Sequence, residues 1–110
     1  MLPMNKVLSV LGLARRASRL AIGFNESDAA AKRHKASLIL TSNDVSPKTA
    51  KEVRFIGEKY GVPYIALDCP MEQLSAAIGI RAGVVAVTDR GFAEKVTSLC
   101  NIVRKDESAI

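Results

Sequence analysis

The chain has 110 residues, 48% hydrophobic and 25% charged, which is the composition of one ordinary globular domain and excludes a disordered or collagen-like chain. Its net charge of +5 and pI of about 9.5 favour an anionic partner. The longest apolar runs, near 62–67 and 84–87, are far shorter than the roughly 20 residues that span a bilayer, so we expect no membrane association. The two cysteines cannot form a disulfide framework and are typical of a reducing compartment.

The excess positive charge lies in the first third of the chain. The first 35 residues carry seven cationic and two acidic side chains, whereas the other 75 carry nine of each. Because this excess extends over two separate predicted elements, it favours an anionic polymer over a small acidic substrate.

The N-terminal segment resembles a signal peptide only faintly. Lys6 precedes an apolar run, but Arg15 and Arg16 stand where a cleavage site needs small residues. Apolar residues at helical spacing instead predict an amphipathic helix over roughly 4–17. We therefore interpret the segment as part of a mature, cytoplasmic protein.

Strand and helix patterns alternate along the rest of the chain. The predicted strands cover 20–22, 37–41, 62–67 and 83–87, and the predicted helices after the first begin near Asn25, Ser46, Pro70 and Asp89. Asn25 is expected to be an N-cap, with Asp28 as the carboxylate three residues later. Ser46 and Pro47 predict a cap followed by the first helical position, and Gly61 a helix end.

The predicted strands are continuous apolar runs, as expected when both faces of a sheet are covered. The sequence therefore predicts a single α/β domain over 1–110, with helices on both faces of a mixed or parallel sheet. We expect its core within about 4–100, followed by a polar, frayed tail from Arg104 to Ile110.

The sequence contains few residues suited to catalysis or metal binding. It has no GxxxxGK[ST] or GxGxxG phosphate loop. His34 lies among cations at the end of a predicted surface helix, a poor place for a general base. Asp44, Asp68 and Asp89 follow predicted strands, where ligands can gather, but we favour loop and capping roles for them. We expect no catalytic residue, no metal and no cofactor.

The segment Gly23-Phe24-Asn25-Glu26, followed by 32–35, is more informative. It is compatible with ordinary turn and cap chemistry. It is equally compatible with base recognition, because a Glu carboxylate accepts hydrogen bonds from guanine N1–H and N2–H₂ while an Asn amide reaches O6. Such contacts require bases exposed by a bend or by non-Watson–Crick pairing.

Four motifs in order resemble the kink-turn-binding ribosomal protein superfamily, which includes an archaeal large-subunit protein. They are Gly23-x-Asn25-Glu26 (G-x-N-E), Ile39 to Pro47 (an apolar strand followed by D-x-x-P), Val62-Pro63-Tyr64 (V-P-Y) and Leu74 to Gly79 (L-G-x-A-x-G). The segments 11–17 and 84–93 look most like the small bacterial YlxQ-like branch. The resemblance covers roughly 5–99.

The resemblance implies a three-layer α/β/α sandwich around a four-stranded mixed sheet, and binding of kinked RNA without a cofactor. It implies that Asn25 and Glu26 contact guanine edges. It also implies that the loop before the last strand packs on extruded bases; that loop is Ile80, Arg81, Ala82, Gly83 and Val84. The chain departs from the family at Ala29, where a Lys is usual, and at His34 and Ser75, where Gly is usual.

The main hypothesis is therefore a non-enzymatic, ribosome-associated, cytoplasmic protein of translation that binds structured RNA. Five cations are expected to neutralise its phosphates: Arg15, Arg16, Lys32, Arg33 and Lys35. Lys32 lies one helical turn beyond Ala29 and is a candidate replacement for the missing Lys. One alternative is a protein-interaction or stress-regulatory module of the same fold. A fragment of an RNA methyltransferase ranks last, and the sequence does not predict an oligomeric state.

Overall fold

The computed structural model describes residues 3–108, which are built around a four-stranded sheet with the order β1-β4-β2-β3. The strands are β1 (Leu20–Ile22), β2 (Leu38–Thr41), β3 (Tyr64–Ala66) and β4 (Val84–Val87). β4 runs antiparallel to both β1 and β2, whereas β3 runs parallel to β2. The sheet is therefore mixed, which confirms the architecture implied by the resemblance.

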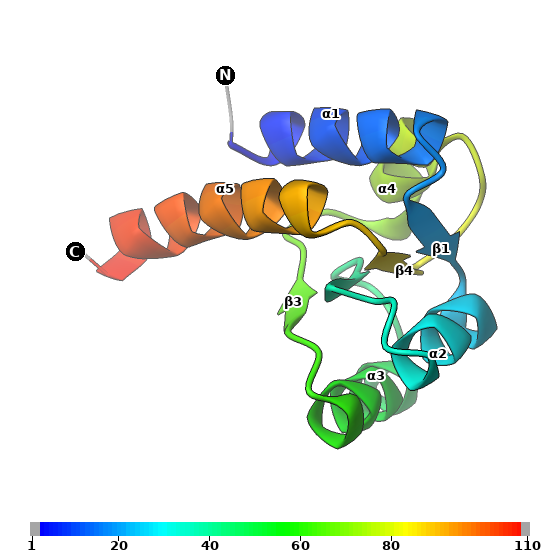
Figure 1. Cartoon of the computed structure of the whole chain (residues 1–110). Helices are drawn as coiled ribbons and strands as arrows, with labels where there is room; N and C mark the ends of the chain where they lie inside the picture. Colours follow the sequence, from blue (N-terminus) through cyan, green and yellow to red (C-terminus); the bar gives the residue numbers. More distant parts are fainter. Residues whose placement is uncertain (1–2, 109–110) are drawn as a thin grey trace.

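Helices cover both faces of this sheet, as Figure 1 shows. One layer contains α1 (Pro3–Arg16), α4 (Met71–Ile78) and α5 (Arg90–Ser108), and the other contains α2 (Phe24–Lys32) and α3 (Pro47–Tyr60). The predicted three-layer sandwich is thus confirmed. Within the described residues, no helix is long and apolar enough to cross a membrane.

The two central strands are buried along their whole length because each face of the sheet has its own core. Side chains alternate between the faces of a strand. Leu38 and Leu40 of β2 accordingly pack in the cluster under α1, α4 and α5, whereas Ile39 packs with Val53 and Ile56 of α3. This two-sided burial explains the continuous apolar runs in the sequence.

Several helix ends form where local residues predict them. The Ser46 Oγ accepts a hydrogen bond from the Thr49 N–H at 3.1 Å, and α3 begins at Pro47. α3 ends at Gly61, whose φ of 70° lies in the left-handed region that glycine tolerates. The Asp89 Oδ2 accepts a hydrogen bond from the Phe92 N–H at 2.9 Å and caps α5.

The predicted cap of α2 is wrong. α2 begins at Phe24, and its N-cap is Gly23, with φ 98° and ψ 162° and no side-chain cap. Glycine alone readily adopts this backbone conformation, so the chain can turn from β1 directly into the helix. Asn25 is consequently inside the first turn, and neither its amide nor Asp28 caps the helix.

The end of α2 resembles a Schellman motif formed around a residue other than glycine. His34 has φ 59°, its N–H donates to the Ala31 carbonyl at 3.1 Å, and the Lys35 N–H donates to the Ala30 carbonyl at 2.9 Å. His34 therefore occupies the position at which the family usually has glycine, and it does so in the conformation that favours glycine.

The last helix extends into the polar C-terminal tail. α5 continues to Ser108, so most of the tail expected to be frayed is helical. A helix that is already capped and packed on the sheet can extend into a polar segment, because each added residue gains one hydrogen bond without the cost of starting a new helix. The last two residues of that tail, 109–110, lie outside the described residues.

Candidate nucleic-acid interface

The end of β1 and the start of β4 bring the G-x-N-E segment beside the loop at 80–84. β1 pairs with β4 through Ile22 and Val85, and the Gly23 N–H donates to the Val84 carbonyl at 2.8 Å. The two segments that the resemblance singles out are far apart in sequence but are joined by this hydrogen bond. They form one surface at the edge of the sheet.

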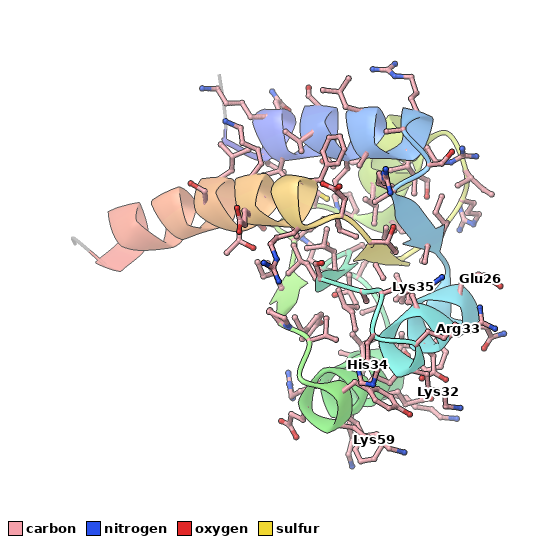
Figure 2. The ribbon with its side chains drawn as sticks, viewed as in Figure 1. Glu26, Lys32, Arg33, His34, Lys35 and Lys59 are labelled. Atoms are coloured by element: carbon pink, nitrogen blue, oxygen red, sulfur yellow. The ribbon has the colours of Figure 1, made fainter. Side chains whose placement is uncertain are left out.

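Asn25 and Glu26 are both exposed in the first turn of α2. The next residue, Ser27, is 2% exposed, and its Oγ donates to the Ala21 carbonyl at 3.3 Å, which fixes the rotation of the helix against β1. In Figure 2, Glu26 lies on the side of α2 nearer to β1. An amide and a carboxylate thus face solvent next to the unpaired N–H groups of a helix N-terminus.

The loop between α4 and β4 is held by Ser75, one of the residues that depart from the family pattern. Its Oγ accepts a hydrogen bond from the Ala82 N–H at 3.0 Å and donates one to the Ala82 carbonyl at 3.3 Å. Ala82 is 8% exposed, whereas Ile80 is 45% exposed and Arg81 is also exposed. The hydroxyl therefore anchors the base of a loop whose tip presents one apolar and one cationic side chain.

Asp44 lies close to this loop and has a capping role. Its Oδ1 accepts hydrogen bonds from the Ser42 Oγ at 2.8 Å and from the Met71 N–H at 2.9 Å, at the start of α4. These bonds, first that of Ser42 and then that of Met71, lower the pKa of Asp44. The Ser42 N–H in turn donates to the Gly83 carbonyl at 3.0 Å, which ties this cap to the loop.

The predicted phosphate contacts lie mainly at the other end of β1. The cations predicted to contact phosphate are all exposed, and they lie in the last turn of α1 or at and after the end of α2: Arg15, Arg16, Lys32, Arg33 and Lys35. The Thr88 N–H donates to the Arg19 carbonyl at 2.9 Å, so the start of β1, with Arg19 beside it, meets the end of β4. A strand of three residues is about 10 Å long. The cations and the G-x-N-E segment therefore flank the same edge strand.

Lys32 lies on the side of α2 that faces α3 and not on the side that faces β1. In Figure 2 it lies on the side of α2 nearer to α3, whereas Lys35 and Glu26 lie on the side nearer to β1. It lines a hollow of about 430 Å³ between α2 and α3. Lys32 is therefore not on the same helix face as Glu26.

The hollow between α2 and α3 is a feature that the sequence analysis missed. We call it the α2–α3 groove. Its lining includes aromatic and cationic side chains, namely Phe24, Lys32, Lys51, Phe55, Lys59 and Tyr60. Phe55 is 61% exposed. The sequence did contain a signal for it. Phe55 lies between Val53 and Ile56 in the sequence, but these two face the core, so the helical period places the large apolar Phe55 ring on the outer face of α3.

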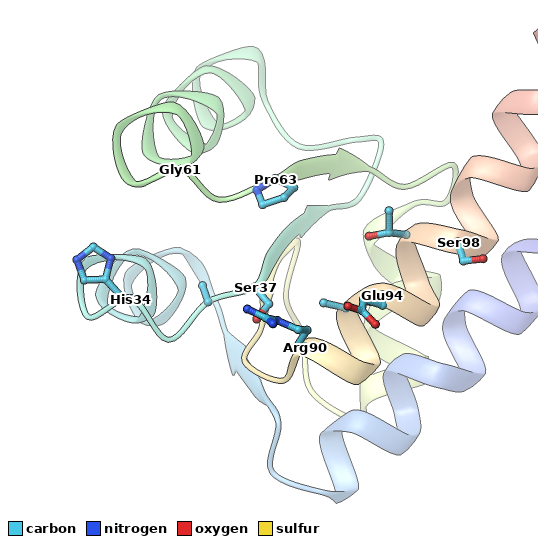
Figure 3. Close-up of a pocket in the computed structure, with 10 residues that line it drawn as sticks. His34, Ser37, Gly61, Pro63, Arg90, Glu94 and Ser98 are labelled. Atoms are coloured by element: carbon cyan, nitrogen blue, oxygen red, sulfur yellow. The ribbon is translucent and has the colours of Figure 1, made fainter.

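A separate hollow of about 730 Å³ lies between α5 and the start of β3. It is at the end of the sheet opposite to Asn25, where β2 and β3 begin and β4 ends. Figure 3 shows His34 across this hollow from Arg90 and Glu94, with Pro63 and Ser37 between them. It has the larger volume of the two hollows. Its lining includes His34, which lies between the predicted phosphate contacts Arg33 and Lys35 in the sequence, but it does not include Asn25 or Glu26.

The fold and the site define a class: α/β/α sandwiches in which the helix after the first strand and the loop before the last one share a surface. The chain belongs to the ribosomal protein L7Ae/L30e/S12e/Gadd45 family, whose model matches residues 5–97.

Relatives of known name support this membership, and solved structures share the fold. The chain is 40% identical over 91 residues to the RNA-binding protein YlxQ of Bacillus subtilis (strain 168), covering 82% of this chain and 90% of that protein. It is 33% identical over 94 residues to the protein of the same name from Enterococcus faecium, covering 86% and 90%. Its fold is similar to a protein of unknown function from Bacillus halodurans C, with a TM-score of 0.83, 31% identity and coverage of 87% and 97%. It also matches a Giardia lamblia 15.5kD RNA binding protein, with a TM-score of 0.74, 21% identity and coverage of 98% and 90%.

Proposed function

We propose that this protein is a non-enzymatic RNA-binding protein that recognises kinked RNA through the start of α2 and the loop at 80–84. The observation that carries the proposal is the hydrogen bond between the Gly23 N–H and the Val84 carbonyl, at 2.8 Å. It joins the two predicted RNA-facing segments while Asn25 and Glu26 remain exposed beside them. The relatives named RNA-binding protein YlxQ support the RNA-binding part of this proposal.

The chemistry of this surface suits guanines in non-Watson–Crick pairs. The Glu26 carboxylate accepts hydrogen bonds, as the N1–H and N2–H₂ groups of an exposed guanine edge require, and the Asn25 amide can donate to O6. In a regular RNA helix the guanine N1–H, N2–H₂ and O6 groups are already paired with cytosine, and the deep, narrow major groove excludes side chains. A bend that opens the pairs is therefore a condition of binding, and Ile80 offers an exposed apolar contact for a base outside the stack.

Four cations would neutralise phosphates along β1: Arg15, Arg16, Arg33 and Lys35. Arg81 would neutralise a phosphate beside the G-x-N-E segment. If about four phosphates are contacted, the logarithm of the affinity falls with the logarithm of salt concentration with a slope of roughly −3. The proposal includes association with ribosomal or other structured RNA in the cytoplasm, as a factor or component of translation.

The departure at Ala29 has a defined consequence. A lysine there would lie near Glu26 on the helix surface, whereas Lys32 lies in the α2–α3 groove. We expect Ala29→Lys to strengthen binding to all RNAs and to steepen the salt slope by about one unit, as one added phosphate contact requires.

The test compares the affinity for a kink-turn RNA with the affinity for a straight duplex of the same length. Asn25→Ala and Glu26→Gln should each weaken binding to the kinked RNA about 10- to 100-fold, the range for a lost base contact, and should leave duplex binding unchanged. Asn5→Ala and Glu58→Gln remove the same groups from exposed positions of α1 and α3 and serve as matched controls. Equal binding to both RNAs, unaffected by either variant at the motif, would refute the proposal.

A further inference from the structure

We propose that the α2–α3 groove binds an unpaired nucleotide of the strand that leaves the kink. This inference rests on the proposed function and names a second part of the same RNA. Its basis is a set of side chains that offers stacking surfaces, cations and hydrogen-bond acceptors in one hollow of about 430 Å³, a volume within the range of small-molecule sites.

The stacking surface comes from α3. Phe55 is 61% exposed, although its neighbours Val53 and Ile56 are buried. The Lys59 Nζ lies 6.0 Å from the centre of the Phe55 ring and 5.4 Å from that of Tyr60. The exposed Phe55 ring thus lies beside a cation, and exposed aromatic rings with nearby cations are the combination on which bases of single-stranded nucleic acids stack.

The charges of the groove fit a nucleotide. Lys32 from α2 and Lys51 and Lys59 from α3 also line it and provide ammonium groups for phosphate oxygens. Asp28 and Glu52 line it as well, and their carboxylates are the acceptors that base amino groups require. A purely basic groove would bind any polyanion, whereas acceptors beside aromatic rings favour a base over a phosphate alone.

The position of the groove connects it to the motif. Phe24 lines the groove and is the residue between Gly23 and Asn25. α2 and α3 both begin at the edge of the sheet where β1 and β2 end, because both of these strands run antiparallel to β4. A strand leaving the start of α2 can therefore enter the groove at Phe24 and follow the two helices toward Lys32 and Lys59.

The experiment uses a kink-turn RNA with and without a single-stranded extension of about six nucleotides that contains 2-aminopurine. For the wild type, the extension should raise the affinity and the fluorescence should be quenched on binding. Phe55→Ala should lower the affinity for the extended RNA about 5- to 100-fold, the range for one stacked base, without changing the affinity for the RNA that lacks the extension. Phe55→Tyr should restore both the affinity and the quenching.

Two controls separate the groove from general effects of substitution. Arg54→Ala removes a cation from α3 next to Phe55, but Arg54 lines a different hollow, with Glu58 and Tyr64. Leu13→Ala removes another exposed apolar side chain, which is 50% exposed on α1. Both variants should retain the effect of the extension.

The failures of the two proposals are distinguishable. Glu26→Gln should weaken binding of the kink but keep the gain from the extension. If the wild type does not prefer the kinked RNA, the proposed function is wrong. Binding of the free single-stranded oligonucleotide then tests the groove by itself. Quenching that depends on Phe55 supports nucleotide binding in the groove, and an absence of quenching overturns it. An affinity for the extended RNA that is the same for the wild type and Phe55→Ala would also overturn it and would make the groove a candidate surface for a protein.

Discussion

Ser75 provides the sharpest stability test, because a single hydroxyl makes both hydrogen bonds to the backbone of Ala82. Ser75→Ala removes both. Ala82 is 8% exposed, so its N–H would be left without a partner, which costs about 1–3 kcal/mol. Alanine is the better helix former by about 0.5 kcal/mol, which offsets part of this cost. We therefore expect a net loss of about 0.5–2.5 kcal/mol in the free energy of unfolding.

Thermal denaturation followed by circular dichroism measures this loss. For a chain of this size, 1 kcal/mol shifts the Tm by about 4 °C, so Ser75→Ala should lower it by about 2–10 °C. Ser9→Ala is the matched control, because Ser9 is an exposed residue of α1, and its substitution should leave the Tm unchanged or slightly raised.

Ser75→Ala should also weaken binding to the kinked RNA by about threefold to tenfold, since ordering a loop on binding costs about 0.5–1.5 kcal/mol per immobilised side chain. A variant as stable as the wild type, with undiminished affinity for the kinked RNA, would refute the argument that this hydroxyl anchors the loop at 80–84.

Three further predictions concern stability. His34→Gly should raise the free energy of unfolding by about 0.5–1 kcal/mol in urea denaturation, because it relieves a left-handed conformation at φ 59°; a loss of stability would contradict this. Gly57→Ala should lower it by about 1–3 kcal/mol, because the added Cβ would lie 2.7 Å from the Val62 carbonyl oxygen, and an unchanged urea midpoint would argue against this clash. The hydrogen bonds from Ser42 and then Met71 lower the pKa of Asp44 in the folded state, so its contribution is present above the unfolded pKa of about 3.9 and is lost as the pH falls through the folded pKa. Asp44→Asn should therefore show a flatter decline of Tm below about pH 4 than the wild type, and parallel profiles would exclude this role.

Local sequence signals determined most of the elements and several of their ends. Ser46 and Pro47 start α3, and Gly61 ends it, through contacts among neighbouring residues. The same local logic failed at Asn25, where a cap residue was predicted two positions too late. The backbone freedom of Gly23 allowed the helix to begin earlier, and the pairing of β1 with β4 fixed the position of Gly23.

The candidate site also has parts that the sequence predicts and parts that only the structure shows. The G-x-N-E pattern could be found in the sequence because its residues are adjacent. The role of Ser75 could not, since its partner Ala82 lies across a turn whose path no local propensity specifies. The α2–α3 groove was also missed, because a helix pattern shows which residues avoid the core but not which second helix lies beside them.

By itself the sequence determined the alternation of strands and helices, the burial of both faces of the sheet and a cationic first third, because these follow from hydrophobic period, capping chemistry and charge. Only the tertiary structure decided the strand order β1-β4-β2-β3, and with it the contact of Gly23 with Val84. The physical reason is that strand pairing between distant segments is selected by the packing of the whole core. That same packing set α2 beside α3 and placed Phe55 next to Lys59 in the groove.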